Sequence, residues 1–399
     1  MNLSISIKNN IRNKFFQIIV LVLMVSLVIN PSMGLNSARN GLHLWFNILL
    51  PSLLPFFILS ELFIASGLVQ YFGRLLGPIM GPIFKISGEG SFPLIMSFVS
   101  GYPVGAKLTS RLRGLNLISK REGDRLVTLA STSGPLYILG AVLIGMLSMP
   151  NLTGLMIIPH YLGAITVGIV FSHLPNNPKR SRKQYIPSKQ ITNNNKIKSD
   201  SLPVIITNSV RDGVNSILLI GGFVIIYNVI IDVLLSSHLV NIFIIHIGNM
   251  ININPELIKG IFAGLIELTT GCNRISSLDI SMIHKILSIN FIIGWGGLSI
   301  LSQAISFISQ TDINVKLYFV SKALHGFIST VYTYILYILF YKDYLIPSSL
   351  DNFIKEEVYN LKTWLENIYF STKMSFGICI FFIVLSILVH NISFIKKRG

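Results

Sequence analysis

The chain has 399 residues, of which 51% are hydrophobic and 12% are charged, whereas an ordinary soluble domain carries about 25% charged residues. Its 32 Lys and Arg residues outnumber its 16 Asp and Glu residues, which gives a net charge of +16. The cations stand beside long apolar runs, as in the cytoplasmic loops of membrane proteins, so the composition excludes an ordinary soluble domain and argues against nucleic acid as a partner.

The first predicted element is an apolar run over Phe15–Ile29, which follows three basic residues. A cleaved signal peptide is one interpretation of this pattern. The segment Asn30–Gly34 that follows has no convincing small-x-small cleavage site. We therefore expect a retained transmembrane anchor over residues 1–35.

A longer stretch, between Arg125 and Lys179, contains no Asp, Glu, Lys or Arg. A helix needs about 20 apolar residues to cross a bilayer, so this stretch is expected to hold two crossings, near 126–148 and 152–174. Further charge-free runs lie at Asn40–Ser60, Gly213–Ile231, Ile286–Thr311, Ala323–Tyr341 and Met374–Ile395. Together with the first run, they predict an all-α integral membrane protein with about eight transmembrane helices.

Two other apolar runs are too short and too interrupted to be ordinary spans. The run Gly90–Ala106 contains Gly101 and Pro103, and the run Gly260–Cys272 contains Glu267. Irregular backbone at membrane depth is tolerated only where protein surrounds it or where it lines a cavity. We therefore predict two re-entrant hairpins at these runs.

The distribution of Lys and Arg orients these elements with both termini in the cytoplasm. The first hairpin then enters from the cytoplasm and the second from the opposite face. Inverted repeats whose broken elements meet near the midplane are a recurrent design of secondary transporters. The predicted organisation is an anchor (1–35), a first repeat (36–175), a basic cytoplasmic linker (176–201), a second repeat (202–341), an extracytoplasmic segment (342–373) and a C-terminal transmembrane helix (374–399).

The two hairpin tips carry most of the candidate binding residues. Both tips place hydroxyl groups beside glycine with a cation just after them, and this pattern suits a small molecule that bears two acidic groups. The candidates at the tips are Ser100, Gly101, Tyr102, Gly105, Lys107, Glu267, Thr269, Thr270, Gly271, Asn273 and Arg274. The spans that follow the hairpins add Ser133, Gly134, Pro135, Ser299 and Gln303.

Several of these candidates have a structural interpretation as well. Lys107 and Arg274 are also the kind of cation that stands at a membrane surface. A carboxylate such as Glu267 is costly in an apolar hairpin and is a functional candidate by default, but it also suits the capping of freed backbone N–H groups. Lys322 and His325, three residues apart, form another polar face, for which helix–helix hydrogen bonding is the alternative.

The sequence contains no phosphate-binding Walker loop, no cluster of metal ligands and no hydrolase triad. Its two cysteines, Cys272 and Cys379, give neither a disulfide framework nor a zinc spacing. We therefore expect a protein that is not an enzyme and that uses no cofactor and no metal.

A set of motifs extends over both halves of the chain. They are Trp45, Pro51–Phe57, Ser100–Lys107 and Ser133–Val142 in the first half, and Gly221–Phe223, Gly264–Gly271, Gly296–Ile300 and Gln303 in the second. Over roughly residues 15–340, the chain resembles the sporulation integral membrane protein family called YlbJ. That resemblance implies kinship with the nucleoside-recognition or gate-domain membrane proteins, so that both repeats are expected to be gate-like.

The resemblance also implies a function. It indicates a stage V sporulation protein of the outer forespore membrane that passes dipicolinic acid from the mother cell toward the spore. The expected partners are this small dianion and the lipid bilayer, and a homo-oligomer or an association with other sporulation membrane proteins stays open. Transport of a nucleoside or related small molecule, a scaffold that transports nothing, and a place in the cell membrane are the alternatives.

Overall fold

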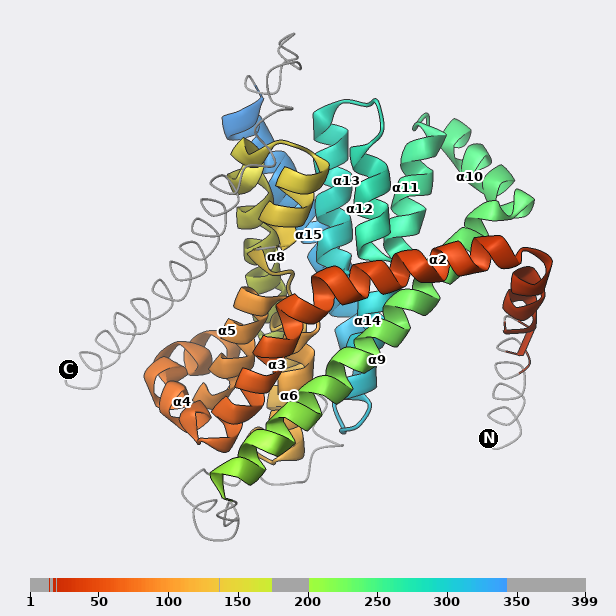
Figure 1. Cartoon of the computed structure of the whole chain (residues 1–399). Coiled ribbons are helices and arrows are strands. Elements are labelled where there is room, and N and C mark those ends of the chain that lie inside the picture. Colours follow the sequence, from red (N-terminus) through yellow and green to blue (C-terminus); the bar gives the residue numbers. More distant parts are fainter. Residues whose placement is uncertain (1–13, 15–16, 19, 136, 174–200, 343–399) are drawn as a thin grey trace, which may run out of the picture.

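A computed structural model describes residues 14–342, except 15, 16, 19, 136 and 174–200. Within these described residues every regular element is helical, which confirms the predicted all-α class (Figure 1). The first half contains α2 (Pro31–Leu44), η1 (Trp45–Leu49), α3 (Leu50–Ala65), α4 (Leu68–Ile79), η2 (Met80–Phe84), η3 (Gly88–Gly90), α5 (Ser91–Ser100), α6 (Val104–Gly114), α7 (Lys120–Leu129), η4 (Tyr137–Met146), η5 (Pro150–Leu152) and α8 (Thr153–His173). The second half contains α9 (Leu202–Ser236), α10 (His238–Met250), α11 (Pro255–Ile266), α12 (Leu268–Ser276), α13 (Met282–Trp295), α14 (Gly297–Ile308), α15 (Val315–Leu336) and η7 (Tyr337–Tyr341).

Four helical segments of the described residues are long and apolar enough to cross a membrane: Pro150–His173, Leu202–Ser236, Met282–Ile308 and Val315–Tyr341. They coincide with four of the predicted spans. Two bent helix pairs, Val20–Ile29 with Pro31–Asn47 and Leu53–Ala65 with Leu68–Phe84, raise the number to six if each pair is one span. The predicted linker at 176–201, apart from Ser201, and the segments 343–373 and 374–399 lie outside the described residues.

The first predicted spans have different bounds in the structure. We expected an anchor that ends by residue 35 and a separate span that begins at Asn40. Instead, one helical run extends from Pro31 through α2, η1 and α3 to Ala65, and it meets the preceding helix at a bend of 109°. Pro31 explains the bend, because proline is tolerated in the first turn of a helix but disrupts a helix interior.

The predicted interruptions fall where the helices break. The first hairpin consists of α5 and α6, which are separated by residues 101–103, and the second consists of α11 and α12, which are separated by Glu267. The crossing expected near 126–148 is also broken, because α7 ends at Leu129 and η4 begins only at Tyr137. A fourth break separates α13 from α14 at Gly296, whose φ of +88° lies in the left-handed region that favours glycine.

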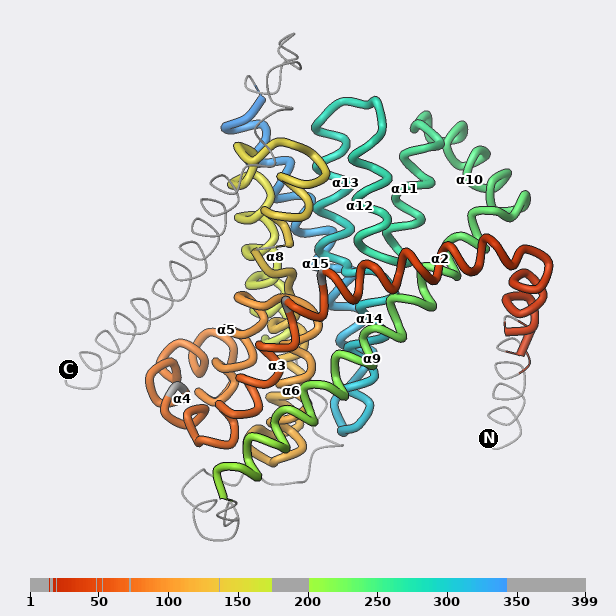
Figure 2. Tube along the Cα trace, in the orientation of Figure 1, coloured from red at the N-terminus to blue at the C-terminus, as the bar shows by residue number. Residues whose placement is uncertain are grey.

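Two layers position these broken elements. The helices α2, α3 and α9 lie across one side of a bundle that contains α8, α13 and α15 (Figures 1 and 2). The layer is held together by close approaches such as the hydrogen bond that Trp45 Nε1 donates to the Ile217 carbonyl at 2.9 Å. Within the bundle, the two halves of the chain pack across each other: α6 of the first hairpin lies against α14, and α12 of the second hairpin lies against η4.

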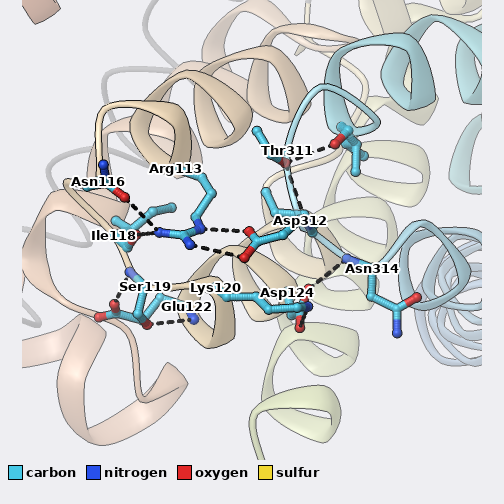
Figure 3. A network of polar contacts seen from close by, with 12 residues as sticks. Arg113, Asn116, Ile118, Ser119, Lys120, Glu122, Asp124, Thr311, Asp312 and Asn314 are labelled. Atoms are coloured by element: carbon cyan, nitrogen blue, oxygen red, sulfur yellow. Dashed lines mark hydrogen bonds and ion pairs between the residues drawn. The ribbon is translucent and has the colours of Figure 1, made fainter. Parts of the chain in front are cut away.

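The α6–α7 connection and the α14–α15 connection meet at one end of the molecule (Figure 3). Arg113 donates two hydrogen bonds to Asp312, at 2.8 and 3.0 Å, and Asp124 accepts one from the Asn314 backbone N–H at 2.7 Å. Such a bidentate pair fixes orientation as well as distance. The network therefore ties the end of the first hairpin to the loop of the second half.

Candidate functional site

The four helix breaks converge in the interior. Gly101 has a φ of +83°, and a Cβ atom placed on it would lie 2.4 Å from the Gly134 nitrogen. At this point the backbone of the first hairpin therefore touches the backbone of the break between α7 and η4, and Ser97 of α5 hydrogen-bonds to Thr132 of the same break. Likewise, a Cβ on Gly297 would lie 3.0 Å from the Leu268 nitrogen, so the α13–α14 break touches the second hairpin. At these positions the glycines allow one broken backbone to approach another.

A lysine joins the breaks of the two halves. Lys322 of α15 is 1% exposed, and its ammonium donates to the Tyr102 hydroxyl at 2.6 Å and to the Ser131 carbonyl at 2.8 Å. Tyr102 in turn donates from its hydroxyl to the Ile293 carbonyl at 3.0 Å. Three segments that are far apart in sequence thus meet around a single buried cation.

Two histidines extend this cluster toward α8. His325 Nδ1 lies 2.9 Å from the Lys322 ammonium, and His325 Nε2 lies 2.8 Å from the His160 carbonyl. An ammonium only donates, so Nδ1 accepts and the proton of His325 sits on Nε2. His160 Nε2 accepts from the Ser133 N–H at 2.9 Å, which places the proton of His160 on Nδ1. That buried Nδ1–H has no hydrogen-bond partner among the residues that the structure describes.

The charge of the cluster is not balanced by a neighbouring acid. In the part of the chain that the structure describes, no Asp or Glu lies within ion-pair distance of Lys322, and its three acceptors are uncharged. Burying a cation costs several kcal/mol unless it is paired and fully hydrogen-bonded. The three acceptors satisfy the N–H groups but, because they are uncharged, they leave the positive charge of a protonated Lys322 unpaired. The chemistry of the site therefore suits an anionic ligand.

Glu267 supplies the other buried charge near the breaks. Its carboxylate accepts from the N–H groups of Thr269 at 3.0 Å and Thr270 at 2.7 Å, and so it caps the N-terminus of α12. The capping that we weighed as an alternative for Glu267 is therefore present. The Tyr137 hydroxyl lies 3.4 Å from that of Thr269, which connects η4 to the tip of the second hairpin.

The two cations that we singled out at the hairpins do not meet. Lys107 is buried within α6 and lies 3.3 Å from Glu61, whereas Arg274 lies 3.6 Å from Asp232. Arg111, one turn beyond Lys107, lies 3.8 Å from Asp212. Because Asp212 and Asp232 are 20 residues apart on the single helix α9, about 30 Å separate the two ion-pair sites. One small dianion cannot contact both cations in this arrangement.

The remaining candidates divide into buried and exposed positions. Gln303 donates to Ser299 at 3.2 Å, which confirms that these two buried side chains share one face of α14. Gly105 packs against the Ala130 carbonyl, Gly271 packs against Gly264, and Pro135 is buried. The Ser100 hydroxyl is buried without a partner, whereas Asn273 is exposed.

Several residues of the central cluster were missed in the sequence analysis. Lys322 and His325 were noticed as a polar face and Ser131 as part of a broken run, but none of the three was selected, and His160 and Tyr318 were not considered. The Ser131 and Tyr318 hydroxyls lie 3.0 Å apart inside the cluster. An imidazole in the long charge-free stretch was a readable signal, because polar side chains within spans usually face the protein interior.

Comparisons with known proteins find a matching family model and relatives of the chain. A family model described as nucleoside recognition matches residues 46–165, which include the first hairpin and the first broken span. The chain is 33% identical over 329 residues to the sporulation integral membrane protein YlbJ of Bacillus subtilis (strain 168), and the match covers 79% of this chain and 81% of that protein. It is also 27% identical over 165 residues to an uncharacterized protein of Alkalihalophilus pseudofirmus, with coverages of 40% and 34%. No solved structure matches the chain significantly.

Proposed function

The chain belongs to the family of the sporulation integral membrane protein YlbJ, and on that premise we propose that it transports a small planar dicarboxylate, dipicolinic acid, across the outer forespore membrane during sporulation. The transport runs from the mother cell toward the spore and involves no catalytic step. The proposal combines the sporulation context of the relative with the chemistry of the central cluster.

The observation that carries the proposal is the buried ammonium of Lys322. It lies among Tyr102, Ser131 and His325, and no carboxylate neutralises it within the described residues. A dicarboxylate that enters the cluster supplies the missing negative charge. The unpartnered Nδ1–H of His160 and the hydroxyl of Ser100 supply further buried hydrogen-bonding groups.

We also propose the architecture that such transport requires. It has about eight transmembrane helices, two oppositely inserted hairpins and two inverted gate-like repeats at 36–175 and 202–341, with both termini in the cytoplasm. The crossed packing supports this arrangement, because α6 lies against α14 as α12 lies against η4, and α7 contacts α15 as α13 contacts α8. Glu267, whose carboxylate caps the N-terminus of α12 at the break of the second hairpin, is then a candidate for gating.

The test is a flux measurement on the purified full-length protein in lipid vesicles. Labelled dipicolinate is supplied outside, with and without a proton gradient. We expect Lys322→Gln to lower the initial rate at least about tenfold, because a charge-assisted contact contributes roughly 1.5–3 kcal/mol. Lys316→Gln is the matched control, since Lys316 lies on the same helix but is exposed, and it should transport at the wild-type rate.

Correct folding is checked by the elution volume and the melting temperature of each variant in detergent. Wild-type flux in a correctly folded Lys322→Gln protein contradicts the proposed role of the cluster. Absence of dipicolinate flux in the wild-type vesicles contradicts the proposed substrate.

A nucleoside is a second candidate substrate, because the nucleoside-recognition family model matches residues 46–165. A nucleoside carries no carboxylate, so its transport should depend little on the charge of Lys322. Competition by uridine in the same vesicles separates the two: uridine that blocks flux in the wild type and in Lys322→Gln alike favours the nucleoside.

A further inference from the structure

A cavity of about 350 Å³ lies apart from the central cluster, toward the C-terminal end of α6. Its walls come from α3, α6, α9 and the end of α14 with the residues that follow. The side chains of Arg111 and Asp212 are 46% and 44% exposed, whereas those of Lys107 and Glu61 are 8% and 5% exposed. The cavity therefore has a mouth that solvent reaches and a buried floor.

One face of α6 supplies the donors of this cavity. Lys107, Ser110 and Arg111 stand at positions i, i+3 and i+4 and all line it. The buried Lys107 ammonium lies 3.3 Å from Glu61 and 4.4 Å from the centre of the Phe57 ring, and among the described residues it has no well-directed hydrogen-bond acceptor. The Ser110 hydroxyl is also buried and has no hydrogen-bond partner within the described part of the chain. Buried polar groups are normally hydrogen-bonded, so two such groups on one wall indicate that the cavity is built to hold a polar ligand.

The two acids of the cavity, Glu61 and Asp212, contact the cations Lys107 and Arg111 only through long ion pairs. Glu61 lies 3.3 Å from both Lys107 and Arg111, and Asp212 lies 3.8 Å from Arg111. These distances are longer than those of well-formed charge-assisted hydrogen bonds. The four groups together carry no net charge. Because the resident ion pairs are long, a carboxylate that arrives from solution can compete with the resident acids for the same donors.

We propose that this cavity is an entry station that binds the dicarboxylate before it reaches the central cluster. Lys107, Ser110 and Arg111 receive one carboxylate of the ligand, and Glu61 and Asp212 are the groups it displaces. The same helix leads inward, because α6 begins at Val104, two residues after Tyr102 of the cluster. This inference rests on the proposed transport of a dicarboxylate and adds a second binding site to it.

The test compares the concentration dependence of dipicolinate flux in vesicles for Lys107→Gln, Arg111→Gln and Ser110→Ala. An entry station acts on capture, so we expect the half-saturating concentration to rise about tenfold in the two charge variants. The maximal rate should stay within about twofold of the wild type, because the central cluster is intact. Arg121→Gln is the control, since Arg121 is an exposed arginine on the neighbouring helix α7 and does not line the cavity.

A binding measurement keeps this inference separate from the proposed function. With labelled dipicolinate and the detergent-solubilised full-length protein, Lys322→Gln should retain binding that Arg111→Gln, added to it, removes. Retained binding in that double variant, or a lower maximal rate with an unchanged half-saturating concentration, overturns the entry station. Dipicolinate flux that is absent from the wild type overturns the proposed function instead.

Discussion

At the scale of single residues, the contact between Gly101 and Gly134 leaves no room for a side chain. A Cβ on Gly101 would lie 2.4 Å from a backbone nitrogen, and the φ of +83° is unfavourable for alanine. We expect Gly101→Ala to lower the free energy of unfolding by about 2–4 kcal/mol, since backbone cannot move aside as a flexible side chain can. The measurement is the melting temperature of the protein in detergent.

Gly222→Ala provides the control for that substitution. Gly222 lies within α9, and no atom of the described residues is found within 4 Å of its added Cβ. Alanine is favoured over glycine in a helix by up to about 1 kcal/mol, so Gly222→Ala should match or exceed the stability of the wild type. Equal melting temperatures for Gly101→Ala and the wild type would show that the two breaks do not touch.

The residue scale also shows what the sequence could and could not reveal about the site. Gly101 and Gly134 were visible as breaks and were selected as binding positions, but the sequence did not reveal that their backbones lie against each other. Lys107 was visible as a cation after a hairpin. Its pairing with Glu61 was not, because that contact depends on how α3 packs beside α6.

At the scale of elements, the network between the α6–α7 and α14–α15 connections has a predictable dependence on pH. The guanidinium of Arg113, which donates to Asp312, lowers the pKa of that carboxyl below its usual value. A lowered pKa means that the stabilisation is fully present above the unfolded pKa of about 3.9 and is lost as the pH falls through the lower folded value. Because Asp312 is half exposed, the contribution is at most about 1 kcal/mol.

We therefore expect Asp312→Asn to melt about 1–3 °C below the wild type at neutral pH. The difference should begin to shrink as the pH falls below about 4 and should approach zero as the pH falls through the lower folded pKa of the wild-type carboxyl. Asp279→Asn is the control, since Asp279 is exposed in the α12–α13 connection and should not shift the melting temperature. A deficit of Asp312→Asn that persists at low pH contradicts the assignment.

Element boundaries were predictable only where composition changes sharply. The span expected at 152–174 and the helix Pro150–His173 nearly coincide, because charged and polar segments border that run. The run Pro31–Ala65 was divided wrongly. Hydropathy falls near residues 34–39, but no residue there stops a helix, and the direction of the chain changes at Pro31 instead.

At the scale of the whole molecule, the inverted arrangement makes a prediction about the two faces of the membrane. The α6–α7 and α12–α13 connections lie at opposite ends of the bundle (Figure 1). In a protein whose native Cys272 and Cys379 are replaced by alanine, Asn116→Cys and Asp279→Cys place a single thiol in one or the other connection. In vegetative cells made to produce the protein in their cell membrane, a membrane-impermeant maleimide added to the intact cells should label Asp279→Cys and spare Asn116→Cys.

Permeabilised cells provide the control, because there both thiols should react. Labelling of both positions, or of Asn116→Cys alone, in intact cells would contradict the proposed orientation.

Packing between the two halves cannot be read from hydropathy, which is why the contacts of α6 with α14 and of α12 with η4 were not predicted. Only the order of hairpin, broken span and continuous span in each half was apparent from the sequence.

The length of α9 has a consequence for the surroundings of the protein. The charge-free part of α9 lies between Asp212 and Asp232. Asp212 pairs with Arg111 of the first hairpin, and Asp232 pairs with Arg274 of the second hairpin. The roughly 30 Å between these acids equals the thickness of the hydrocarbon layer. In lipids with shorter acyl chains such a helix tilts to keep both ends in water, and its tilt shifts one hairpin relative to the other. Acyl-chain length therefore acts on the geometry of this protein from outside.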